Sequence, residues 1–231
     1  MPKLLDLFCG RFGWSSEFAA RGWECVGIDM IEPPEIPNGC TFIKADVLQI
    51  QVTSGGVFSI REFPDRGPIL WEFKPDFVAA SSPCEEFSIH GLAHFHPNPK
   101  YPSLGIELFN HTRAICEASG RPYIMENVRP AQKFVGIASN HCGPFYLWGN
   151  AVPPLMPHGI TKGIDVGSSK AVKGMNKEER RAYRAQFPWN QSWSTGKQRG
   201  RDTAKAATIP PLLSNTVADY AERILEVAIH L

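Results

Sequence analysis

A cysteine that follows a proline is the residue best suited to chemistry in this chain. Cys84 lies in the segment 82–88 (Ser-Pro-Cys-Glu-Glu-Phe-Ser), shortly after the apolar stretch 77–80. Such a stretch is typical of a buried strand, and a cysteine in the loop beyond it is placed to act as a nucleophile. A buried structural cysteine is the commoner case, so this position alone leaves both interpretations open.

A glutamate follows another apolar stretch farther along the chain. The segment 122–128 reads Pro-Tyr-Ile-Met-Glu-Asn-Val, so Glu126 and Asn127 are expected at a strand end, near the same rim as Cys84. Desolvation favours the neutral form of a buried carboxyl, which suits Glu126 to donate a proton or to hold one on a heterocycle. A glutamate satisfied by local backbone donors is the alternative.

The N-terminal segment predicts a turn that approaches a ligand closely. Residues 4–14 begin as an apolar strand and run into a turn that contains Gly10 and Gly13. Residues 15–21 are helical in composition, with Ser15 or Ser16 as the expected N-cap. Glycines allow close approach of the backbone, and a helix N-terminus favours a carboxylate or a phosphate.

Two acids at strand ends extend this prediction to a nucleotide. Strands are expected at 24–29 and 41–46, and they end in Asp29 and Asp46. In mononucleotide-binding folds, an acid about twenty residues beyond the glycine turn accepts hydrogen bonds from ribose hydroxyls. The pattern favours an adenosine-containing ligand over a generic α/β turn with two solvated carboxylates.

Three of these segments, in this order, resemble the DNA cytosine-5 methyltransferase family. Residues 6–10 resemble its DLF-x-G-x-G-G motif, residues 83–88 its PC-Q-x-F-S motif and residues 126–128 its ENV motif. The likeness covers roughly the first 150 residues, the size of one nucleotide-binding unit, and is strongest to short phage-borne members. It implies an α/β, Rossmann-like fold, a mostly parallel sheet with helices on both faces, and methyl transfer from S-adenosylmethionine to carbon 5 of cytosine in DNA.

The resemblance assigns roles to the candidate residues. Cys84 would add to carbon 6 of a flipped-out cytosine, Glu126 would stabilise the proton on ring nitrogen 3, and Asn127 would position Glu126 or the base edge. Ser88 would contact the nucleic acid. The residues implied for S-adenosylmethionine are Asp6, Phe8, Gly10, Gly13, Asp29, Asp46, Pro83 and Asn215.

Some positions depart from the family. Phe12 stands where the family has the first glycine of its G-G pair, so the turn or the cofactor pocket is expected to differ. Asn215 lies in a segment that resembles the family's final GN-[AS]-V motif. A helix cap that opens the apolar-periodic helix running to Leu231 is the other interpretation of Asn215. The family's Q-x-R-x-R segment has no clean match, and Arg129 or the pair Arg199 and Arg201 could substitute for it.

Charge is concentrated in one late segment. Residues 170–205 hold ten Lys or Arg and three acids, a local balance of +7, although the whole chain carries only +1. Asn176 and Glu179 form a plausible capping box for a short helix. Aromatic residues interleave with the basic ones, which favours a DNA contact over a solvated helix face. The arginines expected to bind nucleic acid are Arg129, Arg180, Arg181, Arg184, Arg199 and Arg201.

The rest of the chain indicates a single domain over residues 1–231. Residues 52–74 read as an irregular excursion with little core content, 85–102 as a mobile loop, and 103–119 as an amphipathic helix. A reduced target-recognition region is expected at about 150–205. His90, His94 and His96 cluster but match no standard zinc pattern, so we expect no metal.

Composition favours a soluble intracellular enzyme, and the resemblance to phage-borne family members implies the cytoplasm of a bacterium or of a phage-infected cell. No apolar run is long enough to span a bilayer, and Met1 leads into a strand rather than a signal peptide. The six scattered cysteines are typical of a reducing compartment. We expect DNA as the partner, with no membrane and no obligate protein partner. The alternatives are an RNA cytosine-5 methyltransferase and a non-catalytic DNA- or cofactor-binding partner of another methyltransferase.

Overall fold

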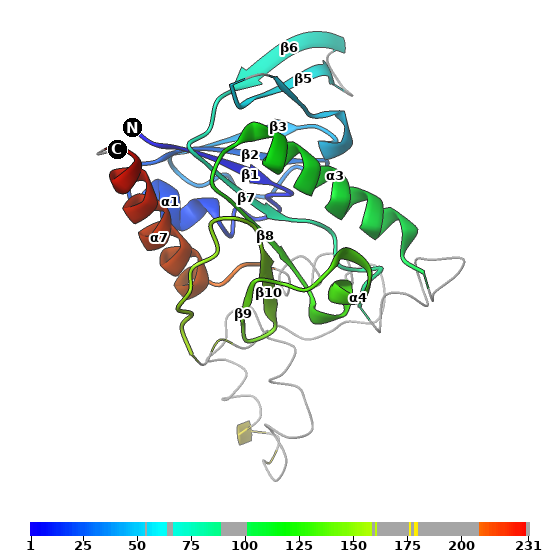
Figure 1. The fold of residues 1–231 in the computed structure, drawn as a ribbon, viewed down its shortest axis with the longest axis vertical. Coiled ribbons are helices and arrows are strands. Elements are labelled where there is room, and N and C mark those ends of the chain that lie inside the picture. Colours follow the sequence, from blue (N-terminus) through cyan, green and yellow to red (C-terminus); the bar gives the residue numbers. More distant parts are fainter. Residues whose placement is uncertain are drawn as a thin grey trace.

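The computed structural model is a mixed α/β fold built on one mostly parallel sheet (Figure 1). It describes residues 1–53, 55–63, 67–88, 101–158, 160, 176, 178–179 and 208–229. The seven strands of the main sheet run in the order β3-β2-β1-β7-β8-β10-β9. Their bounds are β1 Lys3–Leu7, β2 Glu24–Asp29, β3 Cys40–Lys44, β7 Phe77–Ser81, β8 Tyr123–Asn127, β9 Asn140–Cys142 and β10 Phe145–Trp148. The first five in spatial order are parallel, and β10 and β9 are antiparallel additions at the β8 edge.

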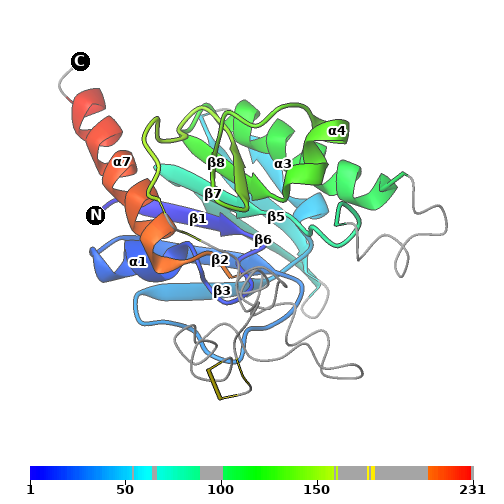
Figure 2. The same cartoon turned by 90° about the horizontal axis from the view of Figure 1, so that it is seen from below.

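Helices cover both faces of this sheet, as the sequence predicted (Figure 2). The helices α1 (Ser15–Ala20) and α7 (Pro211–Ile229) lie on one face, and α3 (Ser103–Ser119) and the short α4 (Gln132–Val135) lie on the other. Side chains alternate along each strand, so neighbouring residues feed two separate cores. Leu4 packs with Trp14 and Phe18 on the α1 side, whereas Leu5 packs with Phe109 on the α3 side. Strands buried on both faces explain the nearly continuous apolar runs in the sequence.

The prediction of an irregular segment over residues 52–74 is wrong. The chain forms a second, antiparallel sheet there, β4 (Gln51–Thr53), β5 (Val57–Phe63) and β6 (Gly67–Phe73), after the 3-10 helix η1 (Val47–Gln49). Gly55 and Gly56 adopt positive φ in the turn between β4 and β5, so these glycines mark a hairpin. Phe58 and Ile60 alternate with polar residues and are fully buried in the core on the α3 side.

Helix boundaries were predicted with mixed success. Helix α3 spans the predicted residues, and Gly120 ends it in a left-handed conformation. The predicted serine N-cap of α1 is wrong, because Trp14 holds that position and the serine hydroxyls donate their hydrogens elsewhere. Asn215 does not cap a helix either, since α7 begins at Pro211, one turn earlier. Strand β3 ends at Lys44, and Asp46 instead caps η1.

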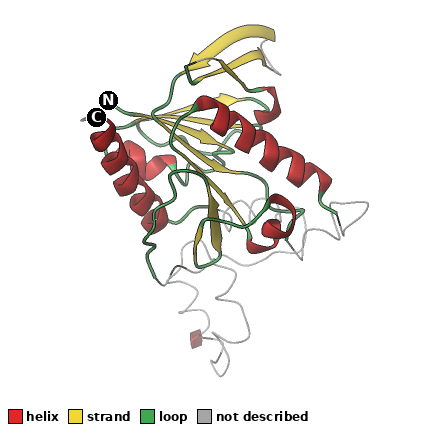
Figure 3. Ribbon diagram, in the orientation of Figure 1, coloured by secondary structure: helices red, strands yellow, loops and turns green. Residues whose placement is uncertain are grey.

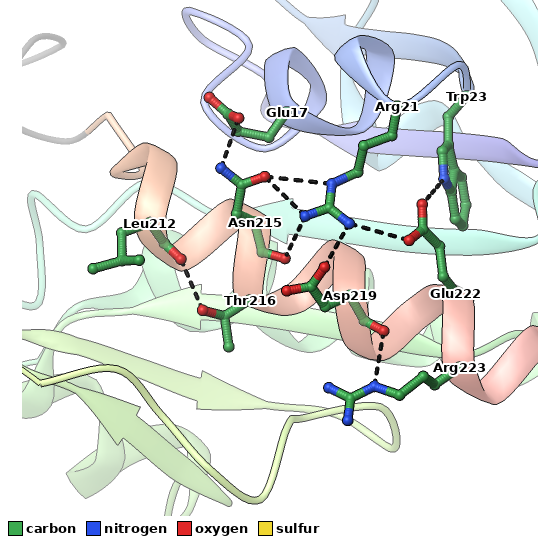
Figure 4. A network of polar contacts seen from close by, with 9 residues as sticks. All are labelled: Glu17, Arg21, Trp23, Leu212, Asn215, Thr216, Asp219, Glu222 and Arg223. Atoms are coloured by element: carbon green, nitrogen blue, oxygen red, sulfur yellow. Dashed lines mark hydrogen bonds and ion pairs between the residues drawn. The ribbon is translucent and has the colours of Figure 1, made fainter.

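A polar network joins α7 to α1 across about 200 residues of chain (Figure 4). The Asn215 side-chain amide donates to Glu17 Oε2 at 2.7 Å, and its Oδ1 accepts from Arg21 Nη2 at 3.0 Å. The same guanidinium contacts Asp219 at 2.6 Å and Glu222 at 3.1 Å. Arg21 therefore lies at the centre of the network that docks the last helix, and Asn215 links it to Glu17.

We expect Asn215→Ala to lower the free energy of unfolding by about 1–2 kcal/mol, because it removes hydrogen bonds to two charged partners. Thr216→Ala is the matched control, since Thr216 bonds only within the helix, to the Leu212 carbonyl. It should change stability by about 0.5 kcal/mol or less. Urea unfolding followed by circular dichroism measures both, and equal midpoints for the two variants would contradict the assignment.

In the part of the chain that the structure describes, none of the helices combines the length and apolar character needed to cross a bilayer. Figure 3 shows the same arrangement by secondary structure, with α3 and α7 as the two long helices of the described chain.

Candidate active site at the carboxyl edge of the sheet

The carboxyl ends of five neighbouring parallel strands meet at one edge of the sheet. Leu7 of β1 pairs with Ile28 of β2 and with Ala80 of β7, and Ser81 of β7 pairs with Glu126 of β8. The segments that follow these strands therefore emerge side by side. The sequence-predicted residues at the strand ends or in the segments that follow are Phe8, Gly10, Asp29, Asp46, Pro83, Cys84, Glu126 and Asn127. This edge is where open α/β sheets bind their ligands.

The turn after β1 has an unusual backbone. Phe8 and Phe12 have φ values of 58° and 59°, and Gly10 has a φ of 50°. A bulky residue in the left-handed region costs roughly 1–2 kcal/mol, and such residues cluster at functional sites. Phe12 thus adopts the conformation that a glycine would adopt more easily. Its ring is fully buried, edge-on to Phe42 and against Gly27, where a side chain would collide with it.

Two aspartates follow the next two strands. Asp29 accepts hydrogen bonds from the backbone N–H of Gly10 and of Ile31, both at 3.0 Å. Its carboxylate is only half-buried, so it ties the glycine turn to the end of β2 and keeps lone pairs for a ligand hydroxyl. Asp46 is also half-buried and accepts from the Leu48 N–H at 3.0 Å.

Asp6 lies beneath the turn rather than on its surface. It is 1% exposed, and its Oδ2 accepts from the Ser15 hydroxyl at 2.6 Å and from the Ser15 N–H at 3.3 Å. No described group bonds its buried Oδ1. Burial raises the pKa of Asp6 to about 7, although the bonds from Ser15 oppose the shift. Its contacts connect β1 to the start of α1.

We expect Asp6→Asn to flatten the pH dependence of stability. The native pKa of about 7 lies above the unfolded value of about 3.9, so the native state binds more protons between them, and stability falls as pH rises. Wild type should lose stability relative to the variant from about pH 4 to about pH 8, by at most about 4 kcal/mol. Thermal unfolding across this range measures it. Parallel curves for the two proteins would contradict the buried-acid interpretation.

The loop after β7 presents Cys84 on a fixed base. The Cys84 carbonyl accepts from the N–H groups of Phe87 and Ser88 at 3.1 and 3.0 Å, which closes a turn. Phe87 is fully buried against Gly105 of α3 and the Phe134 ring. Cys84 itself is half-buried, and the exposed Pro83 precedes it. The thiol is therefore carried by an anchored turn instead of being packed in a core.

Two further contacts fix this turn. Glu86 accepts from the N–H of Gly105, one of the amides that the first turn of α3 leaves unpaired. The Ser88 hydroxyl donates to the Glu85 carbonyl at 3.1 Å. Most of the predicted mobile loop, with His90, His94 and His96, lies outside the described residues. Among those described, no three His, Cys, Asp or Glu side chains gather in a way that could hold a metal ion.

The end of β8 is locked to the residues that lead into Cys84. Glu126 is 5% exposed and Asn127 is fully buried. The Asn127 amide donates to the carbonyl and to the hydroxyl of Ser82, both at 3.0 Å, and its Oδ1 accepts from the Val128 N–H at 2.8 Å. Asn127 thus joins β8 to the Cys84 loop. Sequence reasoning missed Ser82, whose signal is a polar residue between a buried strand and the Pro-Cys pair.

Other predicted residues lie apart from this group. The Asn215 side chain bonds Glu17 and Arg21 and so serves the α1–α7 contact. A side chain at Gly13 would lie 2.7 Å from the Ile209 nitrogen, so Gly13 allows close packing of the segment before α7. Arg129 is exposed and begins the 3-10 helix η2 (Arg129–Ala131), which Val128 separates from β8. The candidates outside the described residues are Arg180, Arg181, Arg184, Arg199 and Arg201.

The capping box predicted in the basic segment is confirmed. Asn176 Oδ1 accepts from the Glu179 N–H at 2.9 Å, and Glu179 Oε2 accepts from the Asn176 N–H at 2.7 Å.

At the carboxyl edge of the sheet, the structure brings together a partly exposed cysteine, a buried carboxyl and a glycine turn tied to an acid. Comparison with known proteins finds no family model that matches this sequence, and no curated protein matches it.

Proposed function

We propose that this chain transfers a methyl group from S-adenosylmethionine to carbon 5 of cytosine in DNA, through a covalent adduct on Cys84. The observation that carries the proposal is the lock between the Cys84 loop and β8, made by the two bonds from Asn127 to Ser82. Through it the loop that carries Cys84, directly after β7, is held beside the nearly buried Glu126 of β8, and the glycine turn follows the neighbouring strand β1.

The residues around the glycine turn suit the methyl donor. The exposed Gly10 lets the backbone approach a ligand, and the Asp29 carboxylate beside it can accept hydrogen bonds from ribose hydroxyls. Asp46 lies after the neighbouring strand, where it could accept from an adenine amino group. The Phe12 ring turns inward and is fully buried, so it does not occupy the surface of this edge. S-adenosylmethionine bound here would supply an electrophilic methyl group.

The protein's own groups would activate the base. Carbon 5 of cytosine is too weak a nucleophile to take a methyl group, so the Cys84 thiolate first adds to carbon 6. Glu126 holds the proton on ring nitrogen 3 and so favours the enamine whose carbon 5 attacks the methyl group. The methyl–sulfonium bond would break as the new carbon–carbon bond forms, leaving the neutral thioether. Loss of the carbon 5 proton to water and elimination of the thiolate would then release methylcytosine and free Cys84. Access to both faces of the ring requires a base that has left the helical stack.

DNA is the proposed substrate because basic and aromatic residues interleave in segment 170–205. The exposed Arg129 adds a cation two residues after Asn127 in the sequence.

Label transfer to matched nucleic acids tests the proposal. Methyl-labelled S-adenosylmethionine is incubated with the protein and with duplex DNA or RNA of the same sequence, and the nucleosides are then separated. We expect label in 5-methyldeoxycytidine. Label only in 5-methylcytidine would replace the proposal with the RNA enzyme, and binding without transfer to either would replace it with a non-catalytic partner.

A further inference from the structure

The end of β7 carries a half-buried serine that neither the motifs nor the mechanism uses. Ser81 is the last residue of β7 and pairs directly with Glu126 of β8. Paired residues of adjacent parallel strands lie about 4.8 Å apart and point to the same face. Ser81 follows Phe77 and Ala79 on the α1 side, and Glu126 follows Ile124 on that side. The hydroxyl and the carboxyl are therefore neighbours on one face.

Trp14 fixes one side of this hydroxyl. The Trp14 indole Nε1–H donates to Ser81 Oγ at 3.0 Å. Trp14 is only 1% exposed, and its carbonyl accepts from the Ser214 hydroxyl of α7 at 2.7 Å, so the indole has little freedom to move. Because Oγ accepts from Trp14, its own hydrogen points away from the indole and remains available to an acceptor.

We propose that Ser81 is a positioning residue that directs its hydroxyl hydrogen to the Glu126 carboxyl, with Trp14 holding the hydroxyl in place. The proposal rests on the function proposed above, in which Glu126 holds a proton on the base. It links the glycine turn, through the indole of Trp14, to the carboxyl that acts on the base. Glu126 is nearly buried, so a fixed donor beside it determines where the carboxyl points.

The first test compares kinetics of Ser81 variants. Ser81→Ala should lower kcat roughly 10-fold to 100-fold with KM for both substrates within about 3-fold, because a misplaced catalytic group slows the chemical step. Ser81→Thr keeps the hydroxyl and should restore most of kcat. Trp14→Phe should act in the same direction, and combining it with Ser81→Ala should cost no more than Ser81→Ala alone. Ser59→Ala is the control, since it removes a serine hydroxyl from β5, a strand of the second sheet.

The second test needs no activity. The protein is labelled with carbon-13 at the glutamate side-chain carboxyls, and the Glu126 signal is assigned by its loss in Glu126→Gln. Ser81→Ala should move this signal and Ser59→Ala should not. An unmoved signal overturns the proposal whatever the kinetics show, and so does wild-type kcat in Ser81→Ala. If wild type transfers no methyl group, the function proposed above fails, and the carbon signal alone decides the Ser81 contact.

Discussion

Replacing Cys84 with alanine is expected to lower kcat for methyl transfer to DNA by about 10⁴-fold or more, because the proposed mechanism forms the bond to carbon 6 through this thiol. The thiol is half-buried on an anchored turn, so its loss should change the free energy of unfolding by about 0.5 kcal/mol or less. Binding of S-adenosylmethionine, measured by calorimetry, should persist, because the glycine turn and Asp29 are untouched.

Cys40→Ala provides the matched control for this prediction. Cys40 is a free and half-buried cysteine at the start of β3, at the opposite end of the strand from the proposed site. Its replacement should leave kcat within a few-fold of wild type. Transfer that survives in Cys84→Ala, or that is lost equally in both variants, would contradict the role given to Cys84.

The second large effect concerns Glu126. We expect Glu126→Gln to lower kcat by about 10²-fold to 10⁴-fold, since an amide keeps the shape of the side chain but cannot hold the transferable proton. Stability should not fall, because the side chain is nearly buried and a neutral amide costs less to bury than a carboxylate. Single-turnover methyl transfer with excess enzyme isolates the chemical step from product release.

Glu107→Gln makes the same chemical change on the exposed surface of α3 and serves as the control. It should match wild type in both rate and stability. A Glu126→Gln rate within about 3-fold of wild type would show that Glu126 does not act on the base, and a loss of stability would show that its carboxyl is mainly structural.

Prediction from sequence was strongest where strands are buried on both faces. The apolar runs at 24–29 and 77–80 identified β2 and β7, and the acid or polar residue after each run identified the edge of the sheet. Because parallel strands end together, strand ends alone brought Asp29, Cys84 and Glu126 to the same edge. The periodicity of 103–119 gave the whole of α3.

The wrong predictions share one cause: the same residue type can serve different local structures, and contacts distant in sequence decide between them. The segment 52–74 was predicted to be irregular, although its glycines Gly55 and Gly56 build a hairpin turn. Ser15 has the composition of an N-cap, but its hydroxyl donates to Asp6, a partner that only the folded chain supplies. Asn215 likewise meets Glu17 and Arg21 about 200 residues away, a pairing that no local pattern encodes.

The central claim is a covalent bond between Cys84 and the target base, and a trapping experiment tests it most directly. Duplex DNA with 5-fluorocytosine blocks the final elimination, because fluorine cannot leave as a proton does. With S-adenosylmethionine present, we expect a stable protein–DNA complex, and digestion followed by mass spectrometry should find the methylated nucleotide on the Cys84 peptide. An adduct on another residue, or DNA and S-adenosylmethionine bound with no adduct at all, would contradict the mechanism.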